Sequence, residues 1–167
     1  TTPLSLNRIS GTTGEIASFW YNTSQKGSIT VTASSTAYNT TSDYRLKENI
    51  TPVQGASDIV KAMQPVTYTF KSDGSWHDGF LAHELQELHP RAVTGEKDAM
   101  VDEEYEVTPA VLDDDGNVVT DAVMGTRSVP DYQGVDYSKL TPILTAALQE
   151  ALNKIDALED RITTLEG

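Results

Sequence analysis

The N-terminal part of the chain contains two short runs that predict β-strands. Ser28–Thr32 alternates polar and apolar side chains, which is the period of a half-buried strand, and Ile16–Tyr21 is a second strand-like run. A polar turn containing Gly27 separates them. Two such strands cannot bury a core by themselves. We therefore expect them to pack against further strands, from upstream sequence or from other copies of the chain.

Beyond residue 42 the pattern predicts a small mixed domain. Residues 57–63 read as a short amphipathic helix that ends before Gln64-Pro65, because a proline disfavours the helical conformation of the residue before it. In chain order, the further features are a strand over 66–70, a strand end leading into a helix over 79–88, an acidic stretch over 96–106, and a hairpin with arms 111–112 and 118–119.

The last helix, expected over about 139–166, has the clearest periodicity. Its apolar positions alternate in spacing between three and four residues, which predicts the seam of a left-handed coiled coil. The a positions are Thr141, Leu148, Ile155 and Ile162, and the d positions are Leu144, Ala151, Leu158 and Leu165. Thr141 and Ala151 leave the number of helices in the coil open, and a single amphipathic helix packed on its own domain is the alternative. Glu150 and Lys154 form a favourable i,i+4 pair.

These patterns, with a change of composition near residue 42, predict an α+β chain with two domains. Residues 1–42, of which 18 are Ser or Thr, are expected to form the end of a β-stalk. Residues 43–167 are expected to form a mixed domain with helices, a β-hairpin and the C-terminal coiled-coil helix. An intertwined stalk of identical subunits would cover the predicted strands, and a monomeric hairpin is the alternative.

The formal net charge is −13 and is distributed unevenly. Residues 1–42 carry one acid against two bases, so residues 43–167 carry 24 acids against 10 bases and a charge of −14. This excludes nucleic acid as a partner, since phosphate binding needs clustered lysine and arginine. Such acidity is typical of a solvated surface that resists aggregation.

Several classes of protein and site are excluded by what the sequence lacks. The chain has no cysteine, hence no disulfide and no thiolate metal site. No apolar run is long enough to cross a bilayer, and the first residues lack the pattern of a signal peptide, so we expect a soluble protein without a membrane partner. The absence of an initial methionine suggests a fragment of a longer polypeptide.

Ser42 and Lys47 are the candidate catalytic pair. A serine hydroxyl becomes nucleophilic when a base removes its proton, and a lysine can be that base when burial or a nearby cation favours its neutral form. Arg45 is a candidate for that cation. Residues five apart do not share a helix face, so the two side chains meet only if the chain bends or if Lys47 comes from another subunit. By chemistry alone, a solvated linker is the more common explanation of such a segment.

Other motifs have structural explanations. The spacing of His77, His83 and His89 does not fit a zinc-binding His-Glu-x-x-His motif, and residues 113–117 lack the ligand pattern of a calcium loop and fit a β-turn. The aromatic residues Trp20, Tyr21 and Trp76 have the composition of a sugar site but usually pack. We expect no metal and no cofactor.

Three blocks in the chain resemble one protein family. Residues 42–50 (SDYRLKENI) resemble the opening signature of the intramolecular chaperone auto-processing family, which caps phage tailspikes, endosialidases and tail fibres and occurs in a eukaryotic membrane-bound transcription factor. Residues 79–84 (GFLAHE), followed by Pro90, resemble its Gly-Phe-x-Ala-x-Glu helix, and residues 134–142 (GVDYSKLTP) resemble its block before the C-terminal helix. The resemblance covers residues 42–167 in order.

The resemblance implies an intertwined homotrimer that templates an upstream triple-stranded β-stalk, its folding client, and then cuts itself off as a single-turnover serine peptidase. Ser42 would be the nucleophile, Lys47 the general base and Ser42–Asp43 the scissile bond. Cleavage at Thr41–Ser42 by an N→O acyl shift is the fallback. Asp43, Arg45 and Glu48 would orient the pair or contact neighbouring subunits, and we expect the active geometry only in the assembled trimer.

The expected location follows from the same resemblance. The mature fibre in the virion tail would end at Ser42, and residues 43–167 would be released in the host cytoplasm during assembly. Two alternatives remain: a trimerisation domain that never cuts, and a receptor-binding tip that stays attached and binds a host glycan.

Overall fold

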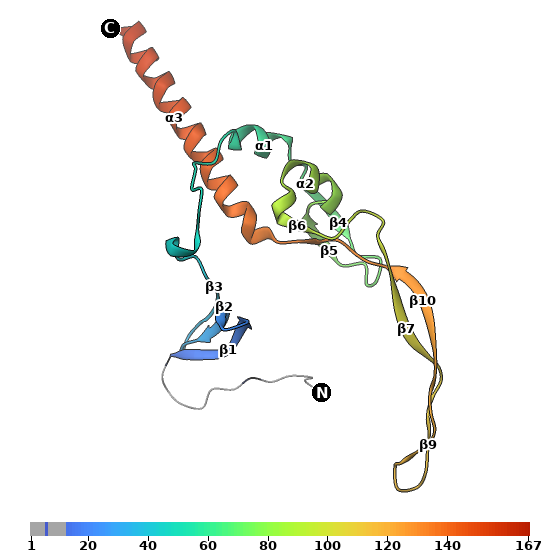
Figure 1. Cartoon of the computed structure of the whole chain (residues 1–167). Coiled ribbons are helices and arrows are strands. Elements are labelled where there is room, and N and C mark those ends of the chain that lie inside the picture. Colours follow the sequence, from blue (N-terminus) through green and yellow to red (C-terminus); the bar gives the residue numbers. More distant parts are fainter. Residues whose placement is uncertain (1–5, 7–12) are drawn as a thin grey trace. The chain divides into compact units, whose positions relative to one another are not determined.

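The structure, a computed structural model, describes residue 6 and residues 13–167. The chain folds into two compact units, residues 1–51 and residues 52–167 (Figure 1). Both units contain small antiparallel sheets, and the α-helices lie in the second unit. The described chain is therefore of the mixed α+β type. None of the helices described is long and apolar enough to cross a membrane.

The first unit contains a three-stranded antiparallel sheet in the order β1-β2-β3. Its strands are β1 (Gly14–Tyr21), β2 (Ser24–Val31) and β3 (Thr36–Thr40). Two of these strands were predicted, whereas β3 was not, because its short polar run carries little apolar alternation. Part of the predicted stalk, residues 1–5 and 7–12, lies outside the described residues.

Gly27 lies inside β2 and not in a turn, which corrects the sequence prediction. It pairs with Phe19 on one side and with Thr40 on the other. A Cβ atom at this position would lie 2.6 Å from the backbone oxygen of Asn39. The strand pairing itself therefore requires a glycine here.

One face of this sheet is apolar and open in the single chain. The paired row Ala17, Ile29 and Tyr38 lies on this face, because directly opposed residues of paired strands point to the same side. Tyr38 is 79% exposed, and Phe19 in the next row is 56% exposed. The described residues of this unit thus leave Phe19 and Tyr38 on this face uncovered.

The second unit is held by a small core between three helices. The helices are α1 (Ala56–Ala62), α2 (Ala82–Leu88) and α3 (Thr141–Glu166), and a hairpin of β4 (Val66–Thr69) and β5 (Trp76–Gly79) precedes α2. A short pairing of β6 (Val93–Thr94) with β11 (Gly134–Val135) joins the middle of the chain to the start of α3. The buried core residues are Ala56, Met63, Leu85, Ala92, Val93, Leu140 and Ile143.

A long hairpin extends between β6 and β11 (Figure 1). It is formed by β7 (Met100–Thr108) and β10 (Val123–Pro130), with β8 (Val111–Leu112) and β9 (Val118–Thr120) at its tip. The tip was predicted, whereas β7 was not, because it runs through the acidic stretch. Aspartate and glutamate have low strand propensity, and this hid the strand from a pattern-based prediction.

The helix α3 confirms the predicted C-terminal helix, and one side of it packs on α1. Its inward side carries Ile143, Ala146, Ala147 and Glu150, whereas the seam residues Leu144, Leu148 and Ile155 are 50%, 61% and 49% exposed. From Ala151 to the end, every residue of α3 is exposed (Figure 1). Packing on its own unit therefore explains only the beginning of the helix.

Glu150 joins α3 to the start of α1. Its carboxylate oxygens accept hydrogen bonds from the backbone N–H groups of Ala56 at 3.1 Å and Ser57 at 2.9 Å. These N–H groups have no partner within α1, because the first turn of a helix leaves its donors free. The sequence paired Glu150 with Lys154, but the hydrogen bonds of this carboxylate go to α1, and Lys154 acts on it through charge alone.

Hydrogen bonding holds the pKa of Glu150 below its usual value of 4.5, first through the Ser57 side chain and then through the backbone N–H groups of Ser57 and Ala56. Because the pKa of Glu150 is lower in the folded chain than its usual value, the charged carboxylate stabilises the fold at pH values above 4.5. This contribution is lost as the pH falls below 4.5 through the lowered folded value.

We predict that Glu150→Gln lowers the Tm near neutral pH by roughly 2–4 °C, since the helix start loses a charged acceptor. The difference from wild type should shrink as the pH falls below the usual glutamate pKa. Thermal melts across this pH range, with Glu159→Gln as a control on the exposed part of α3, measure the effect. A constant difference at all pH values would contradict the assignment.

Candidate functional site

The sheet of the first unit fixes the position of Ser42. The preceding residue, Thr41, continues the pairing of β3 with β2, because its backbone N–H donates to the Lys26 carbonyl at 3.1 Å. Its hydroxyl donates to the Gln25 carbonyl at 3.2 Å. Ser42 is therefore the first residue beyond the sheet, and its backbone starts from an anchored position.

The chain then bends through a short 3₁₀ turn, η1 (Tyr44–Leu46). Asp43 caps this turn, since its side chain accepts a hydrogen bond from the backbone N–H of Arg45 at 2.9 Å. The backbone N–H of Leu46 donates to the Asp43 carbonyl at 3.1 Å, and that of Lys47 donates to the Tyr44 carbonyl at 3.0 Å. These hydrogen bonds define a bend between Ser42 and Lys47.

This turn brings the two candidate catalytic side chains together. The Lys47 Nζ atom donates a hydrogen bond to the Ser42 Oγ atom at 2.7 Å. The spacing of the two residues allowed such a contact through a bend of the chain or through a second subunit, and the structure has the bend. We expected the active geometry only in the assembled trimer. For the distance between Lys47 Nζ and Ser42 Oγ this expectation is wrong, because a single chain already makes the contact.

Arg45 does not act as a free cation beside Lys47, which corrects the role given to it above. Its Nε donates to Asp43 Oδ1 at 3.0 Å and its Nη2 to Asp43 Oδ2 at 2.7 Å, so both oxygens of the carboxylate hold the guanidinium. The side chain and then the backbone N–H of Arg45, with the charge of Lys47, lower the pKa of Asp43. The same bond raises the pKa of Arg45.

The pair has proximity but not burial in the single chain. Ser42 and Lys47 are both exposed, and so is Glu48, whereas Asp43 is half-buried. A lysine acts as a general base only in its neutral form, which burial favours and a nearby carboxylate opposes. The arrangement supplies a positioned hydroxyl and amine, and a further layer of protein would have to remove the solvent.

The other polar candidates are accounted for by packing and turn chemistry. His77 stacks on Tyr68, with ring centroids 5.9 Å apart, and its Nε2 hydrogen bonds to the Ser75 hydroxyl. Asp113 accepts hydrogen bonds from the backbone N–H groups of Asp115 and Asn117, which is a capped turn. Within the described part of the chain, no cluster of His, Asp or Glu has the geometry of a metal site.

A comparison with known families matches a segment of the chain that begins at this turn. Residues 42–94 match the family model described as chaperone of endosialidase, a family also named as a peptidase. The match begins at Ser42 and continues through α1 and α2 to the end of β6. This segment of the chain is thus similar to an intramolecular chaperone domain of this family.

Two further comparisons add little to this identification. A crystal structure of a novel intramolecular chaperone is similar over 68% of this chain and 99% of its own, with 18% identity and a TM-score of 0.39. No curated protein matches the chain. The similarity to the family rests on the match to residues 42–94. Residues 134–142, which resemble the family's block before the C-terminal helix, lie outside this match.

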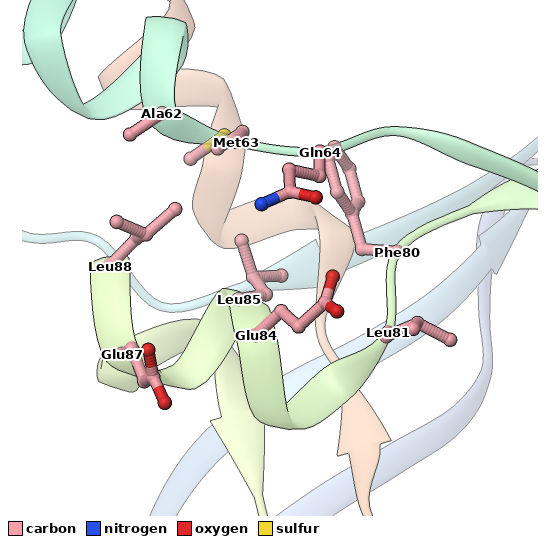
Figure 2. A pocket seen from close by; sticks show the side chains of 9 residues that line it. All are labelled: Ala62, Met63, Gln64, Phe80, Leu81, Glu84, Leu85, Glu87 and Leu88. Atoms are coloured by element: carbon pink, nitrogen blue, oxygen red, sulfur yellow. The ribbon is translucent and has the colours of Figure 1, made fainter.

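The second unit has a small pocket between the end of α1 and α2 (Figure 2). It has a volume of about 140 Å³, with the buried residues Met63 and Leu85 among those that line it. Glu84 extends from α2 toward Gln64 and Phe80, and Glu87 points the other way (Figure 2). A site for a sugar-sized ligand is usually larger, about 300–1,000 Å³. The pocket therefore does not favour the receptor-binding alternative.

Sequence reasoning named the pair, and the family resemblance implied that Asp43 and Arg45 orient it. The hydrogen bonds between Asp43 and Arg45 and the anchoring of Thr41 to β2 were not predicted. The local signal for the first was present, because an aspartate that accepts from the N–H two residues later is a common turn former.

Proposed function

We propose that this chain is the C-terminal end of a phage tail fibre or tailspike, in which residues 43–167 drive trimerisation and folding of the upstream β-stalk and then release themselves by autoproteolysis. The hydrogen bond from Lys47 Nζ to Ser42 Oγ, 2.7 Å long and located where the family match begins, is the observation that carries the proposal. The mature stalk would remain in the virion tail and the chaperone domain in the host cytoplasm.

The exposed apolar surfaces of the chain support an intertwined homotrimer as the working form. Phe19 and Tyr38 on the apolar sheet face and the seam residues of α3 such as Leu148 and Ile155 are exposed, and no described element of the chain covers them. Three copies would cover the sheet face as a triple-stranded stalk and the seam as a parallel coiled coil. A helical nucleus at the C-terminus would also raise the effective concentration of the slow-pairing stalk strands.

The proposed reaction begins with transfer of the Ser42 hydroxyl proton to the neutral Lys47 amine. The serine oxygen attacks a backbone carbonyl carbon and forms a tetrahedral intermediate. Collapse of this intermediate breaks the C–N bond, and the Lys47 ammonium returns its proton to the departing amine. Water then hydrolyses the ester and regenerates the hydroxyl, so one water molecule is consumed in all.

Two peptide bonds lie next to the hydroxyl, and ring strain distinguishes them. Attack of Ser42 Oγ on its own carbonyl would close a strained β-lactone, whereas attack on the Thr41 carbonyl closes an unstrained oxazolidine. Cleavage at Ser42–Asp43, which the family resemblance favours, therefore requires a Ser42 hydroxyl from a second subunit. Cleavage at Thr41–Ser42, the fallback, does not require one.

Assembly would control the reaction through solvent and not through distance. The pair already touches in one chain, but both side chains are exposed. Burial of the turn between subunits would favour the neutral amine that general-base chemistry needs. Cleavage would then report that the stalk has assembled, and the cut would leave the stalk without its assembly route and kinetically trapped.

We predict that Ser42→Ala abolishes cleavage and that Lys47→Ala slows it by at least about 10²-fold, since each removes a partner of the reaction. Intact-mass spectrometry over time after cell-free synthesis measures the fraction cut and identifies the bond. Ser34→Ala, an exposed serine in the turn after β2, is the control and should cleave like wild type. A fragment of residues 43–167 from Ser42→Ala would show that another group makes the cut.

The seam of α3 provides an independent test of the trimer. Ile155→Asp with Ile162→Asp should abolish the trimer and cleavage, because buried carboxylates at a positions cannot be solvated. Asn153→Asp with Thr164→Asp adds the same charge outside the seam and should change neither. Light scattering after size-exclusion chromatography gives the mass. Full cleavage by a monomeric seam variant would separate the reaction from assembly.

The same measurements distinguish the alternatives. A trimer that never cuts, with Ser42 and Lys47 intact, would be a structural trimerisation domain. A receptor-binding tip would stay attached and bind glycans through residues 43–167, and the wider depression beside His89, Arg91 and Lys139, about 590 Å³, is where such a ligand would be sought.

A further inference from the structure

One carboxylate in the turn makes contacts in two directions. Asp43 Oδ1 accepts from the backbone N–H of Arg45 at 2.9 Å and from its Nε at 3.0 Å, and Oδ2 accepts from Nη2 at 2.7 Å. The backbone contact caps the start of η1, and the side-chain contacts hold the guanidinium as a planar, bidentate pair. We call these three hydrogen bonds the Asp43–Arg45 clasp.

The clasp lies between the two residues of the catalytic pair. The turn that it caps contains two backbone hydrogen bonds. The N–H of Lys47 donates to the Tyr44 carbonyl, and the N–H of Leu46 donates to the Asp43 carbonyl. Residues five apart do not share a face of a regular helix, so Lys47 reaches Ser42 only while this turn keeps its shape. Every residue of the turn from Tyr44 to Lys47 is exposed, so little packing holds it in the single chain.

We propose that Asp43 and Arg45 are positioning residues of the self-cleavage reaction, and that the clasp holds the turn in the shape that keeps Lys47 Nζ on Ser42 Oγ. This inference rests on the proposed function, and it concerns the side chains of the two residues, since the backbone nitrogen of Asp43 belongs to the scissile bond itself. A misplacement of a catalytic group by about 1 Å can cost on the order of 10² in rate.

The charge of Asp43 would act in the opposite direction from its geometry. A carboxylate close to Lys47 favours the charged ammonium and so opposes the general base. Arg45 compensates that charge by binding both oxygens. If charge were the main effect of Asp43, its removal would speed cleavage, and if position is the main effect, its removal slows cleavage. The two roles therefore predict opposite signs.

The positions of these residues relative to the scissile bond also explain why the reaction would stop after one turnover. Asp43, Arg45 and Lys47 all lie on the C-terminal side of the Ser42–Asp43 bond, and the hydroxyl lies on the other side. Cleavage there removes the backbone link that holds the base at the nucleophile. The released domain keeps an intact clasp without its serine, and the stalk keeps a serine without its base.

The test compares variants that keep one part of the clasp. Asp43→Asn keeps an oxygen for the Arg45 backbone N–H and loses the ionic pair, and Arg45→Lys keeps the charge and loses the planar fork. We expect each to slow the first-order cleavage rate by about 10- to 100-fold. Asp43→Ala with Arg45→Ala should be little slower than Asp43→Ala alone, because the two residues act as one unit.

The controls separate position from stability and from the proposed function. Arg127→Lys removes the fork of another arginine, which pairs with Glu103 on the long hairpin, and should cleave like wild type. Trimer mass and Tm should be unchanged in the clasp variants, and the pH at which cleavage is half-maximal should stay within about 0.3 of wild type, an allowance that corresponds to a small change in proton affinity.

Three results would overturn the inference. Wild-type rates in Asp43→Asn and Arg45→Lys, with Ser42→Ala and Lys47→Ala inactive, would remove the clasp and leave the proposed function standing. Faster cleavage by Asp43→Asn would show that its charge dominates. Rates that fall only in proportion to a loss of trimer would reduce the clasp to a structural role. If wild type itself does not cut, or Ser42→Ala cuts, the proposed function fails first.

Discussion

The described residues of a single chain leave many large apolar side chains exposed, and this constraint bears on the rest of the structure. Seven apolar residues form the core of the second unit, whereas large apolar side chains stay exposed on the sheet of the first unit, on the long hairpin and along α3. Burial of apolar surface is the main favourable term in folding, and small units gain little of it alone. Under the proposed function, other copies of the chain would cover these side chains, and contacts such as the Glu150 bonds to α1 would give each copy its own shape.

Proximity and desolvation have separate origins in the candidate site. Local backbone chemistry, namely an aspartate cap and a short 3₁₀ turn, brings Lys47 Nζ to Ser42 Oγ within one chain. Nothing local to the turn buries the pair, because the residues around it are exposed. A pair that is aligned early and activated late suits a reaction that must wait for assembly, since alignment costs little and activation depends on the neighbours.

The sequence was informative wherever a long period or a turn residue carried the signal. The heptads of α3, the helix before Pro65 and the hairpin tip at residues 113–117 were predicted because each follows a repeating or local rule. The strand β7 was missed because its acidic side chains disguise it, and β3 because it is short and polar. The approach of Lys47 to Ser42 could not follow from spacing, since it depends on a turn that one aspartate side chain caps.

The boundary of the family match and the boundary of the compact units differ, and the difference bears on release. The match begins at Ser42, whereas residues 43–51 belong to the same compact unit as the sheet. If noncovalent packing tied this segment firmly to the sheet, cutting the backbone after Ser42 would leave the two parts bound. The segment is instead exposed from Tyr44 to Thr51, and its main stabilising contacts are internal to the turn. Under the proposed function, a cut after Ser42 would therefore meet little packing from this segment.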